Sequence, residues 1–477
     1  MRTLSCDVAV IGAGSAGLTA YRAASAQGKR VMLIESGAYG TTCARVGCMP
    51  SKLLIAAADA AHAVRSAPQF GVFAAIVDVD GRAVMDRVRA ERDRFVRFVV
   101  EGIESMDPAS RLSGHARFLA PDRLQVGDDV ALTAPRVVIA TGSRPVIPDA
   151  LRGLGDRLIV NNDVFDWPDL PDSVAVIGSG VIGLELGQAL ARLGVRVAVF
   201  GRGESLAQLQ DAEVRRVAQA CLAEELDLRL HTTIVSAQRS TDDVVLHSRH
   251  ADGRERTESF QFVLAAAGRA PNVGGLGLEC AGIRLNQRGV PVYDPHTMQC
   301  GDSAIFIAGD VAEDRPLQHE AADEGHIAGD NAARFPRVVA YPRRAALSVA
   351  FTDPQMAVVG QSSRALADRR YEYGDGSFAS QGRSRVMLQN RGLLRVYGEH
   401  GSHRFLGAEM IGPRAEHIAH LLAWADQNQM TVDAMLAMPF YHPVVEEGVR
   451  TALRDLQEKL ARHVDPMAHC ADCTPGR

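Results

Sequence analysis

The chain has 477 residues, 47% of them hydrophobic, and a formal net charge of −5 from 52 basic and 57 acidic residues. A chain of this length divides into about three domains with sizeable cores, and its charge balance favours neither a nucleic acid nor a membrane surface as a partner. The sequence has no apolar run of about 18 residues that predicts a transmembrane helix. It enters a predicted strand too early for a signal peptide, and its eight cysteines fit a cytoplasmic protein in which any disulfide is catalytic.

The N-terminal segment has the pattern of a dinucleotide-binding unit. A strand, a turn with three glycines, a helix and a second strand with a terminal acid are predicted in succession: Leu4 to Ile11; Gly12, Gly14 and Gly17; Leu18 to Ala26; Arg30 to Ile34 with Glu35. The glycines allow a tight turn close to a pyrophosphate, and the acid binds the ribose hydroxyls of adenosine. The flanking strands favour this interpretation over a turn that binds nothing.

Two cysteines, Cys43 and Cys48, precede a helix that Pro50 is expected to open. The dipole of that helix and the charge of Lys52 would stabilise a thiolate, which is the form of cysteine that carries out disulfide exchange. The alternative is a buried pair or half of a metal site. No second Cys/His pair with zinc spacing lies nearby, so no metal site is predicted.

The chain then continues with a helix and a set of short strands. An amphipathic helix is predicted around Val84 to Ile103. Strands are predicted around Arg117 to Leu119, Arg123 to Val126 and Arg136 to Ala140, the last running into Thr141-Gly142. Pro145 and Pro148 indicate a link to the next lobe.

A second dinucleotide pattern follows: a strand from Val174 to Ile177, glycines at Gly178, Gly180 and Gly183, a helix from Leu184 to Leu193, and a strand from Val195 to Phe200. Two such units imply two nucleotides, so electrons can pass between them. Gly201-Arg202 stands where an acid is expected, and arginine would pair with a 2′-phosphate. NADP(H) is therefore favoured over NAD(H). Gly183 is a counter-indication, and an ordinary solvated Arg202 is the alternative.

Two more apolar strands are predicted at Val263 to Ala267, before Gly268-Arg269, and at Ala304 to Ala308, before Gly309-Asp310. Asp310 could accept hydrogen bonds from the polyol chain of a flavin. From about Ala346 the chain mixes strands (Val349 to Thr352, Met356 to Val359, Leu393 to Tyr397) with helices (Ala415 to Gln429).

A histidine near the C-terminus is the second candidate reactive group. Pro443 restricts His442 to an extended conformation, and Glu447 lies in the first turn of an amphipathic helix, where it could orient the imidazole. A histidine held by a carboxylate is suited to moving a proton to and from a thiolate. The alternative is a surface histidine before a capped helix.

Nearly the whole chain resembles the FAD-dependent pyridine nucleotide–disulfide oxidoreductases. The cysteine stretch, both glycine patterns, Thr141-Gly142, Gly268-Arg269, Gly309-Asp310 and His442-Pro443 with Glu447 occur in family order. The resemblance implies an α/β fold with two Rossmann-like domains and an α+β dimerisation domain. We expect an FAD domain over 1–148, completed by 273–345, an NAD(P) domain over 149–272, and an interface domain over 346–477 with a flexible tail from 462.

The resemblance also implies roles for individual residues. Cys48 would face the flavin and Cys43 would attack the substrate, with a disulfide between them. Lys52 would pair with Glu185 near the flavin ring, and Thr42, Thr141, Gly142 and Gly268 would belong to the cofactor sites. His442 and Glu447 would serve the disulfide of the other subunit, so that the active protein is a homodimer.

Within the class, the sequence is most similar to dihydrolipoyl dehydrogenases, with a small dithiol, disulfide or lipoyl-bearing protein as substrate. The departures are Thr41, Arg45, Val444 and Gly201-Arg202. Arg45 could lower a thiol pKa or receive an acidic substrate, or could equally point into solvent. The alternatives are an NADPH-dependent disulfide or mercuric-ion reductase and, from another class, a non-catalytic flavoprotein subunit or redox sensor.

The tail carries Cys470 and Cys473. A cysteine pair of this kind could relay electrons or handle a soft metal. The alternative is a passive disordered tail.

Overall fold

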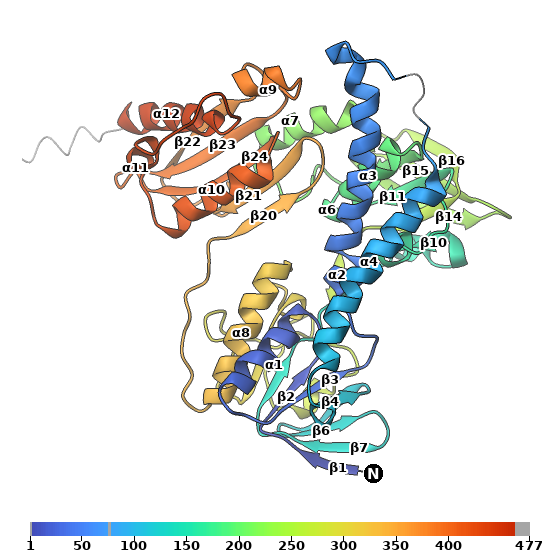
Figure 1. The fold of residues 1–477 in the computed structure, drawn as a ribbon, viewed down its shortest axis with the longest axis vertical. Helices are drawn as coiled ribbons and strands as arrows, with labels where there is room; N and C mark the ends of the chain where they lie inside the picture. The colour runs from blue at the N-terminus through green and yellow to red at the C-terminus, as the bar shows by residue number, and fades with distance from the viewer. Residues whose placement is uncertain (1, 75–77, 463–477) are drawn as a thin grey trace, which may run out of the picture.

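The computed structural model describes residues 2–74 and 78–462. Figure 1 shows an N-terminal α/β body at the bottom, a second α/β body above it, and a C-terminal sheet with its own helices to one side. Five-stranded sheets form the centre of each of these three parts. The predicted α/β class is therefore confirmed, whereas the exact limits of the three expected domains stay predictions.

The first dinucleotide sheet is parallel and has the order β19-β8-β2-β3-β4. Its strands are β2 (Val8–Ile11), β3 (Val31–Glu35), β4 (Arg111–Ser113), β8 (Val137–Ile139) and β19 (Ile305–Ile307). Two helices, α1 (Ser15–Ala26) and α8 (Gln318–Arg334), lie against each other beside it (Figure 1). They can approach this closely because Gly325 has no side chain: a Cβ there would lie 2.2 Å from the carbonyl oxygen of Ala16.

The single strand predicted from Leu4 to Ile11 is wrong, because the structure has two. β1 (Arg2–Ser5) belongs to a separate sheet of order β1-β7-β6-β5, and only β2 enters the dinucleotide sheet. The Asp7 carboxylate between them accepts the backbone N–H of Arg30 (2.8 Å). The other strands of the small sheet are β5 (Ala116–Ala120), β6 (Arg123–Val126) and β7 (Val130–Thr133).

Three helices connect the first two parts: α2 (Thr42–Val46), α3 (Cys48–Ser66) and α4 (Gly81–Glu104). The helix expected to open at Pro50 begins two residues earlier, and the short α2 precedes it. Thr41 makes α2 possible, since its hydroxyl accepts the backbone N–H of Ala44 (3.2 Å). Cys43 therefore lies within one helix and Cys48 is the first residue of the next, with Gly47 between them.

The second dinucleotide sheet is also parallel, with the order β10-β17-β11-β12-β13. Its strands and helices are β10 (Leu158–Ile159), β11 (Ser173–Ile177), β12 (Arg196–Phe200), β13 (Asp227–Arg229), β17 (Phe262–Ala265), α5 (Asn161–Val164), α6 (Val181–Arg192) and α7 (Ala212–Ala223). An antiparallel sheet of β14 (Thr232–Arg239), β15 (Val244–His250) and β16 (Glu255–Phe260) covers it. Two short strands, β9 (Ser143–Pro145) and β18 (Arg269–Pro271), pair between the two parts.

The C-terminal sheet is antiparallel, with the order β20-β21-β24-β23-β22. Its elements are β20 (Leu347–Ala350), β21 (Gln355–Gly360), β22 (Tyr371–Ser377), β23 (Leu393–Glu399), β24 (Phe405–Gly412), α9 (Gly382–Val386), α10 (Ala415–Gln427), α11 (Val432–Leu436) and α12 (Glu447–Arg462). Helix α12 buries Val449, Leu453, Leu456 and Leu460 against β22 and β23. Short 3₁₀ helices occupy Ala67–Phe70, Pro108–Ser110, Asp149–Leu151, Gly155–Arg157, Leu278–Cys280 and Asp310–Ala312.

Candidate active site

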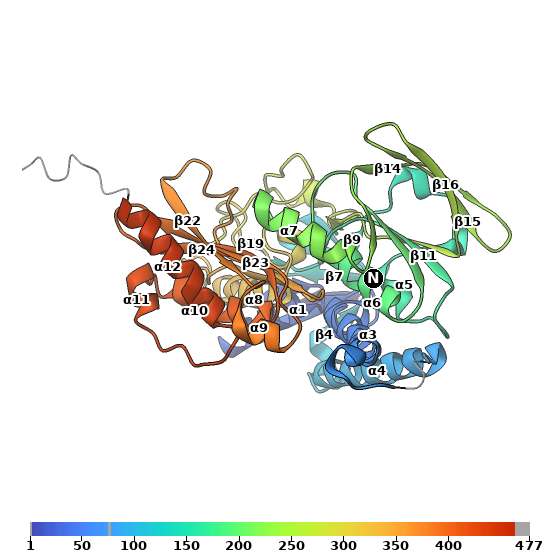
Figure 2. The ribbon, with the colours of Figure 1, turned by 90° about the horizontal axis from the view of Figure 1, so that it is seen from above.

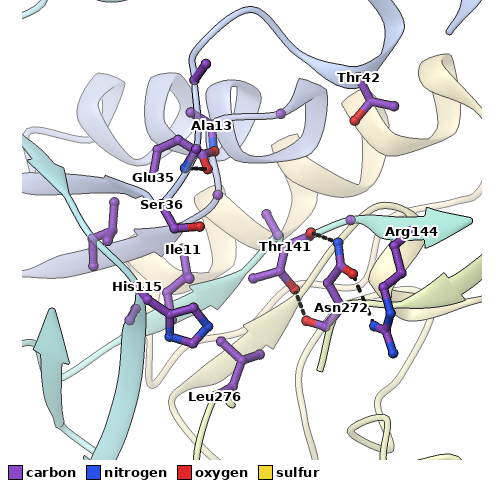
Figure 3. Close-up of a pocket in the computed structure, with 18 of the residues that line it drawn as sticks. Ile11, Ala13, Glu35, Ser36, Thr42, His115, Thr141, Arg144, Asn272 and Leu276 are labelled. Atoms are coloured by element: carbon purple, nitrogen blue, oxygen red, sulfur yellow. Dashed lines mark hydrogen bonds between the residues drawn. The ribbon is translucent and has the colours of Figure 1, made fainter. Parts of the chain in front are cut away.

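A cavity of about 380 Å³ lies at the carboxyl ends of β2, β3 and β8. Its lining includes the turn at Gly12 and Gly14, the end of β3 at Glu35, and Thr141-Gly142 after β8. Figure 3 shows Glu35 and His115 on one side of this space and Thr42 and Arg144 on the other. The carboxyl edge of a parallel sheet is where α/β proteins bind dinucleotides.

The three glycines of the first turn have different tasks. A Cβ at Gly12 would lie 2.3 Å from the Ala140 carbonyl oxygen, and one at Gly17 would lie 1.8 Å from that of Gly12. Both are therefore required by packing. A Cβ at Gly14 would meet nothing within 4 Å, so this glycine leaves open space for a ligand beside the N-terminus of α1.

Polar groups of the lining are fixed by the backbone around them. Glu35 accepts the backbone N–H groups of Ala13 and Gly37, each at 2.8 Å, and retains lone pairs for ribose hydroxyls. Thr141 donates its hydroxyl to the Asn272 carbonyl (2.7 Å), and the Asn272 amide donates back to the Thr141 carbonyl (3.0 Å; Figure 3). The open glycine position, the Glu35 carboxylate and these polar walls fit an FAD.

Sequence reasoning missed Asn272, His115 and Arg144 as lining residues. Asn272 lies three residues after Arg269 of the Gly268-Arg269 motif, which is the one local signal that could have indicated it. Asp310 is placed near this site through Ser143, whose hydroxyl donates to the Asp310 carboxylate (2.6 Å). Its predicted bond to a flavin polyol stays a prediction.

The second glycine turn repeats the geometry of the first. Cβ atoms at Gly178 and Gly183 would lie 2.2 and 2.0 Å from the carbonyl oxygens of Ala266 and Gly178, whereas Gly180 faces open space. A Cβ at Gly201 would lie 2.8 Å from both Leu230 Cδ2 and Ser179 Oγ. A side chain at position 201 would therefore require Leu230 or Ser179 to move, and Arg202, the next residue, is exposed. Gly268 has a φ of +113° after β17, a backbone conformation that favours glycine.

Cys43 and Cys48 face each other across Gly47, and both are free thiols in the structure. The Cys43 thiol donates a hydrogen bond to the Cys48 sulfur, which, with the charge of Lys52, lowers the pKa of Cys48 to about 7. The same hydrogen bond, together with burial, raises the pKa of Cys43. Cys48 is also the first residue of α3, where the helix dipole favours an anion. The pair therefore carries its negative charge on Cys48.

Lys52 reaches the other dinucleotide fold. Its Nζ lies 2.7 Å from the Glu185 carboxylate on α6, which is buried. Glu185 also accepts the backbone N–H of Phe351 (2.8 Å), whose ring centroid lies 4.4 Å from Lys52 Nζ. The expected ion pair is formed, and it joins all three parts of the chain next to the cysteines.

His442 and Glu447 form the second expected pair. His442 Nδ1 lies 3.1 Å from the Glu447 carboxylate, which also accepts the Val444 N–H (3.3 Å) and the Arg450 guanidinium (2.9 Å). Desolvation opposes ionisation, yet the hydrogen bonds from His442 and Val444 and the charges of His442 and Arg450 together outweigh it and hold the pKa of Glu447 below its usual value. The His442 side chain is 79% exposed. Figures 1 and 2 both show α12, which begins at Glu447, well apart from α3, which begins at Cys48.

Arg45 is half-buried, and its two interpretations from the sequence stay predictions. Its guanidinium donates to the carbonyl of Ala38 (3.0 Å), and the side chain lines the dinucleotide cavity. Arg45 lies one turn after Thr42 on α2 and so shares its face, and both residues line the cavity.

Cys470 and Cys473 lie outside the described residues. None of the helices within 2–74 and 78–462 is long and apolar enough to cross a bilayer.

Two dinucleotide folds beside a reactive pair of thiols define a redox protein that binds two nucleotides. The family described as pyridine nucleotide-disulphide oxidoreductase matches residues 6–325, and its dimerisation domain matches residues 347–453. The chain belongs to this family, which depends on FAD and a pyridine nucleotide. Its dimerisation domain supports a homodimer.

Relatives with different activities are about equally similar. The chain is 31% identical over 473 residues to a mercuric reductase from Acidithiobacillus ferrooxidans, covering 97% of this chain and 84% of the relative. It is 31% identical over 460 residues to a dihydrolipoyl dehydrogenase from Halobacterium salinarum, covering 94% and 95%.

Solved structures share the fold. LpdA from Mycobacterium tuberculosis superposes with a TM-score of 0.81 at 25% identity, covering 94% of this chain and 99% of that one. The HOCl-induced flavoprotein disulfide reductase RclA from Escherichia coli gives a TM-score of 0.79 at 22% identity, with the same coverage.

Proposed function

We propose that the protein passes electrons between NAD(P)H, FAD, a Cys43–Cys48 disulfide and a substrate dithiol or disulfide, in the manner of a dihydrolipoyl dehydrogenase. The observation that carries the proposal is the pair of neighbouring free thiols at the start of α3, where the Cys43 thiol and Lys52 lower the pKa of Cys48. A thiolate next to a second thiol is the reduced state of a disulfide-exchange pair. FAD, when bound, accepts hydride from the nicotinamide and supplies the electron pair that reopens the disulfide.

The cysteines and the histidine divide the remaining chemistry. His442 of the partner subunit accepts the Cys43 proton, and the Cys43 thiolate attacks one sulfur of the substrate to form a mixed disulfide. The displaced sulfur leaves as a thiolate and takes that proton back. Cys48 then attacks the Cys43 sulfur, closes the internal disulfide and releases the second substrate thiolate to solvent protons. The substrate gains two electrons and the cysteine pair loses two.

We propose NADP(H) as the preferred nicotinamide nucleotide. An acid at position 201 would bind the 2′-hydroxyl of NAD and repel a 2′-phosphate, but Gly201 stands there instead, and the exposed Arg202 could pair with that phosphate. This feature also favours the second candidate, an NADPH-dependent disulfide or mercuric-ion reductase, since relatives at 31 and 32% identity are named mercuric reductase. A non-catalytic flavoprotein subunit or redox sensor is the candidate of another class.

The experiment that tests these candidates has two stages. Anaerobic titration with NADPH should produce a thiolate-to-flavin charge-transfer band that Cys48→Ser abolishes. Steady-state rates with NADH and NADPH, each crossed with lipoamide, glutathione disulfide and Hg(II), then identify the substrate class. Turnover of lipoamide supports the leading proposal, whereas turnover of Hg(II) alone supports the second. Slow bleaching of the flavin without a band or any turnover would contradict both.

A further inference from the structure

Arg45 is a basic side chain built into the dinucleotide cavity. Its aliphatic stem packs on Gly40, where a Cβ would lie 2.9 Å from Arg45 Cδ. Gly40 also has a φ of +126°, so no other residue fits there without strain. The stem is thereby held in one position, and the hydrogen bond to Ala38 fixes the guanidinium at the cavity wall.

The charge of Arg45 has no counterion in the part of the chain that the structure describes. Among residues 2–74 and 78–462, no carboxylate lies within ion-pair distance of its guanidinium. A guanidinium has five N–H donors, and Ala38 uses one of them. Donors therefore remain for an anion, and arginine binds phosphate oxygens in a bidentate geometry that lysine cannot reproduce.

Of the parts of an FAD bound in this cavity, the diphosphate is the one that the charge of Arg45 would attract. The diphosphate is the anionic part of FAD, and Gly14 leaves space for it beside the N-terminus of α1. At the adenosine end the Glu35 carboxylate would repel phosphate. The Arg45 guanidinium, which lines the same cavity at Ala38, would attract it.

We propose that Arg45 binds the diphosphate of FAD and so retains the cofactor. The inference rests on the flavin site of the proposed function and adds a ligand to it. Because α2 carries both Arg45 and Cys43, the same contact would hold the helix of the attacking thiol against the bound cofactor. Arg45 is thus a positioning residue for Cys43.

The test is FAD retention by the holoprotein, measured without substrate as free flavin in the filtrate during stepwise dilution. Arg45→Gln keeps a donor for Ala38 but removes the charge, so FAD should bind about 10- to 100-fold more weakly. Arg45→Lys keeps the charge without the bidentate geometry and should fall in between. The difference between the natural protein and Arg45→Gln should shrink as salt is added.

Arg94→Gln, an exposed arginine on α4, is the matched control and should retain FAD normally. Retention by Arg45→Gln equal to that of the natural protein would overturn the proposal. Equal losses in Arg45→Gln and Arg45→Lys, unaffected by salt, would also overturn it, because they indicate a purely structural side chain. Cys43→Ser should lose disulfide turnover but retain FAD normally. The proposed disulfide chemistry and the proposed role of Arg45 in FAD binding can therefore fail separately.

Discussion

Lys52 Nζ lies 2.7 Å from Glu185 Oε2, and this ion pair joins the helix that begins at Cys48 to the helix of the second glycine turn. The two charges act on Cys48 in opposite directions. Lys52 lowers the pKa of Cys48 and Glu185 raises it. We therefore expect substitution of either partner to shift the pKa of Cys48 in a defined direction.

Lys52→Gln should raise the pKa of Cys48 above about 7, because the cation that stabilises the thiolate is lost. Glu185→Gln should lower it further, because Lys52 then acts without an opposing carboxylate. The pH dependence of alkylation by iodoacetamide measures both shifts. Lys459→Gln, which removes an ammonium paired with Asp455 on α12, should leave the midpoint unchanged. Shifts of the same sign in both variants would contradict the assignment.

Substitution of Cys43 separates its hydrogen bond from its nucleophilicity. Cys43→Ser keeps a donor to the Cys48 sulfur, so the pKa of Cys48 should stay near 7, whereas Cys43→Ala should raise it. Both variants should lose disulfide turnover, because the attacking thiol is gone. Alkylation profiles and turnover measured together test this, with the exposed Cys280→Ser as control. Equal Cys48 profiles in the serine and alanine variants would exclude the hydrogen bond as the cause.

His442 should act on the cysteines of the other subunit. His442→Gln alone should lower disulfide turnover by about 10²- to 10⁴-fold, the usual contribution of a general acid–base, and leave flavin reduction by NADPH unchanged. Co-refolding this variant with Cys43→Ser should restore activity, because each mixed dimer has one site with both natural residues. A one-to-one mixture should reach about a quarter of natural activity. No recovery in isolated mixed dimers would show that each chain uses its own histidine.

Arg202→Glu should lower kcat/KM for NADPH by about 10-fold or more, since a cation facing the 2′-phosphate becomes an anion. Rates with NADH should change much less, because NADH lacks that phosphate. Steady-state kinetics with both nucleotides make the comparison, and Arg94→Glu on exposed α4 controls for a change in net charge. Equal losses with NADH and NADPH would refute the cofactor assignment.

The sequence by itself determined the features whose residues lie close together in the chain. Both glycine turns, the spacing of Cys43 and Cys48, and the pair of His442 and Glu447 are local patterns, and the structure forms each of them. Strand and helix periodicity likewise placed most elements within a few residues. These features are predictable because the backbone alone brings such residues together.

The tertiary structure decided the rest. The split of the first strand depends on β1 pairing with the distant β7, and the contact of Thr141 with Asn272 spans 131 residues. The direction of Arg45 depends on how α2 is seated over Gly40, and the space beside Gly201 is limited by Leu230 and Ser179. Each is a matter of space and charge contributed by segments far away in sequence, which no local pattern specifies.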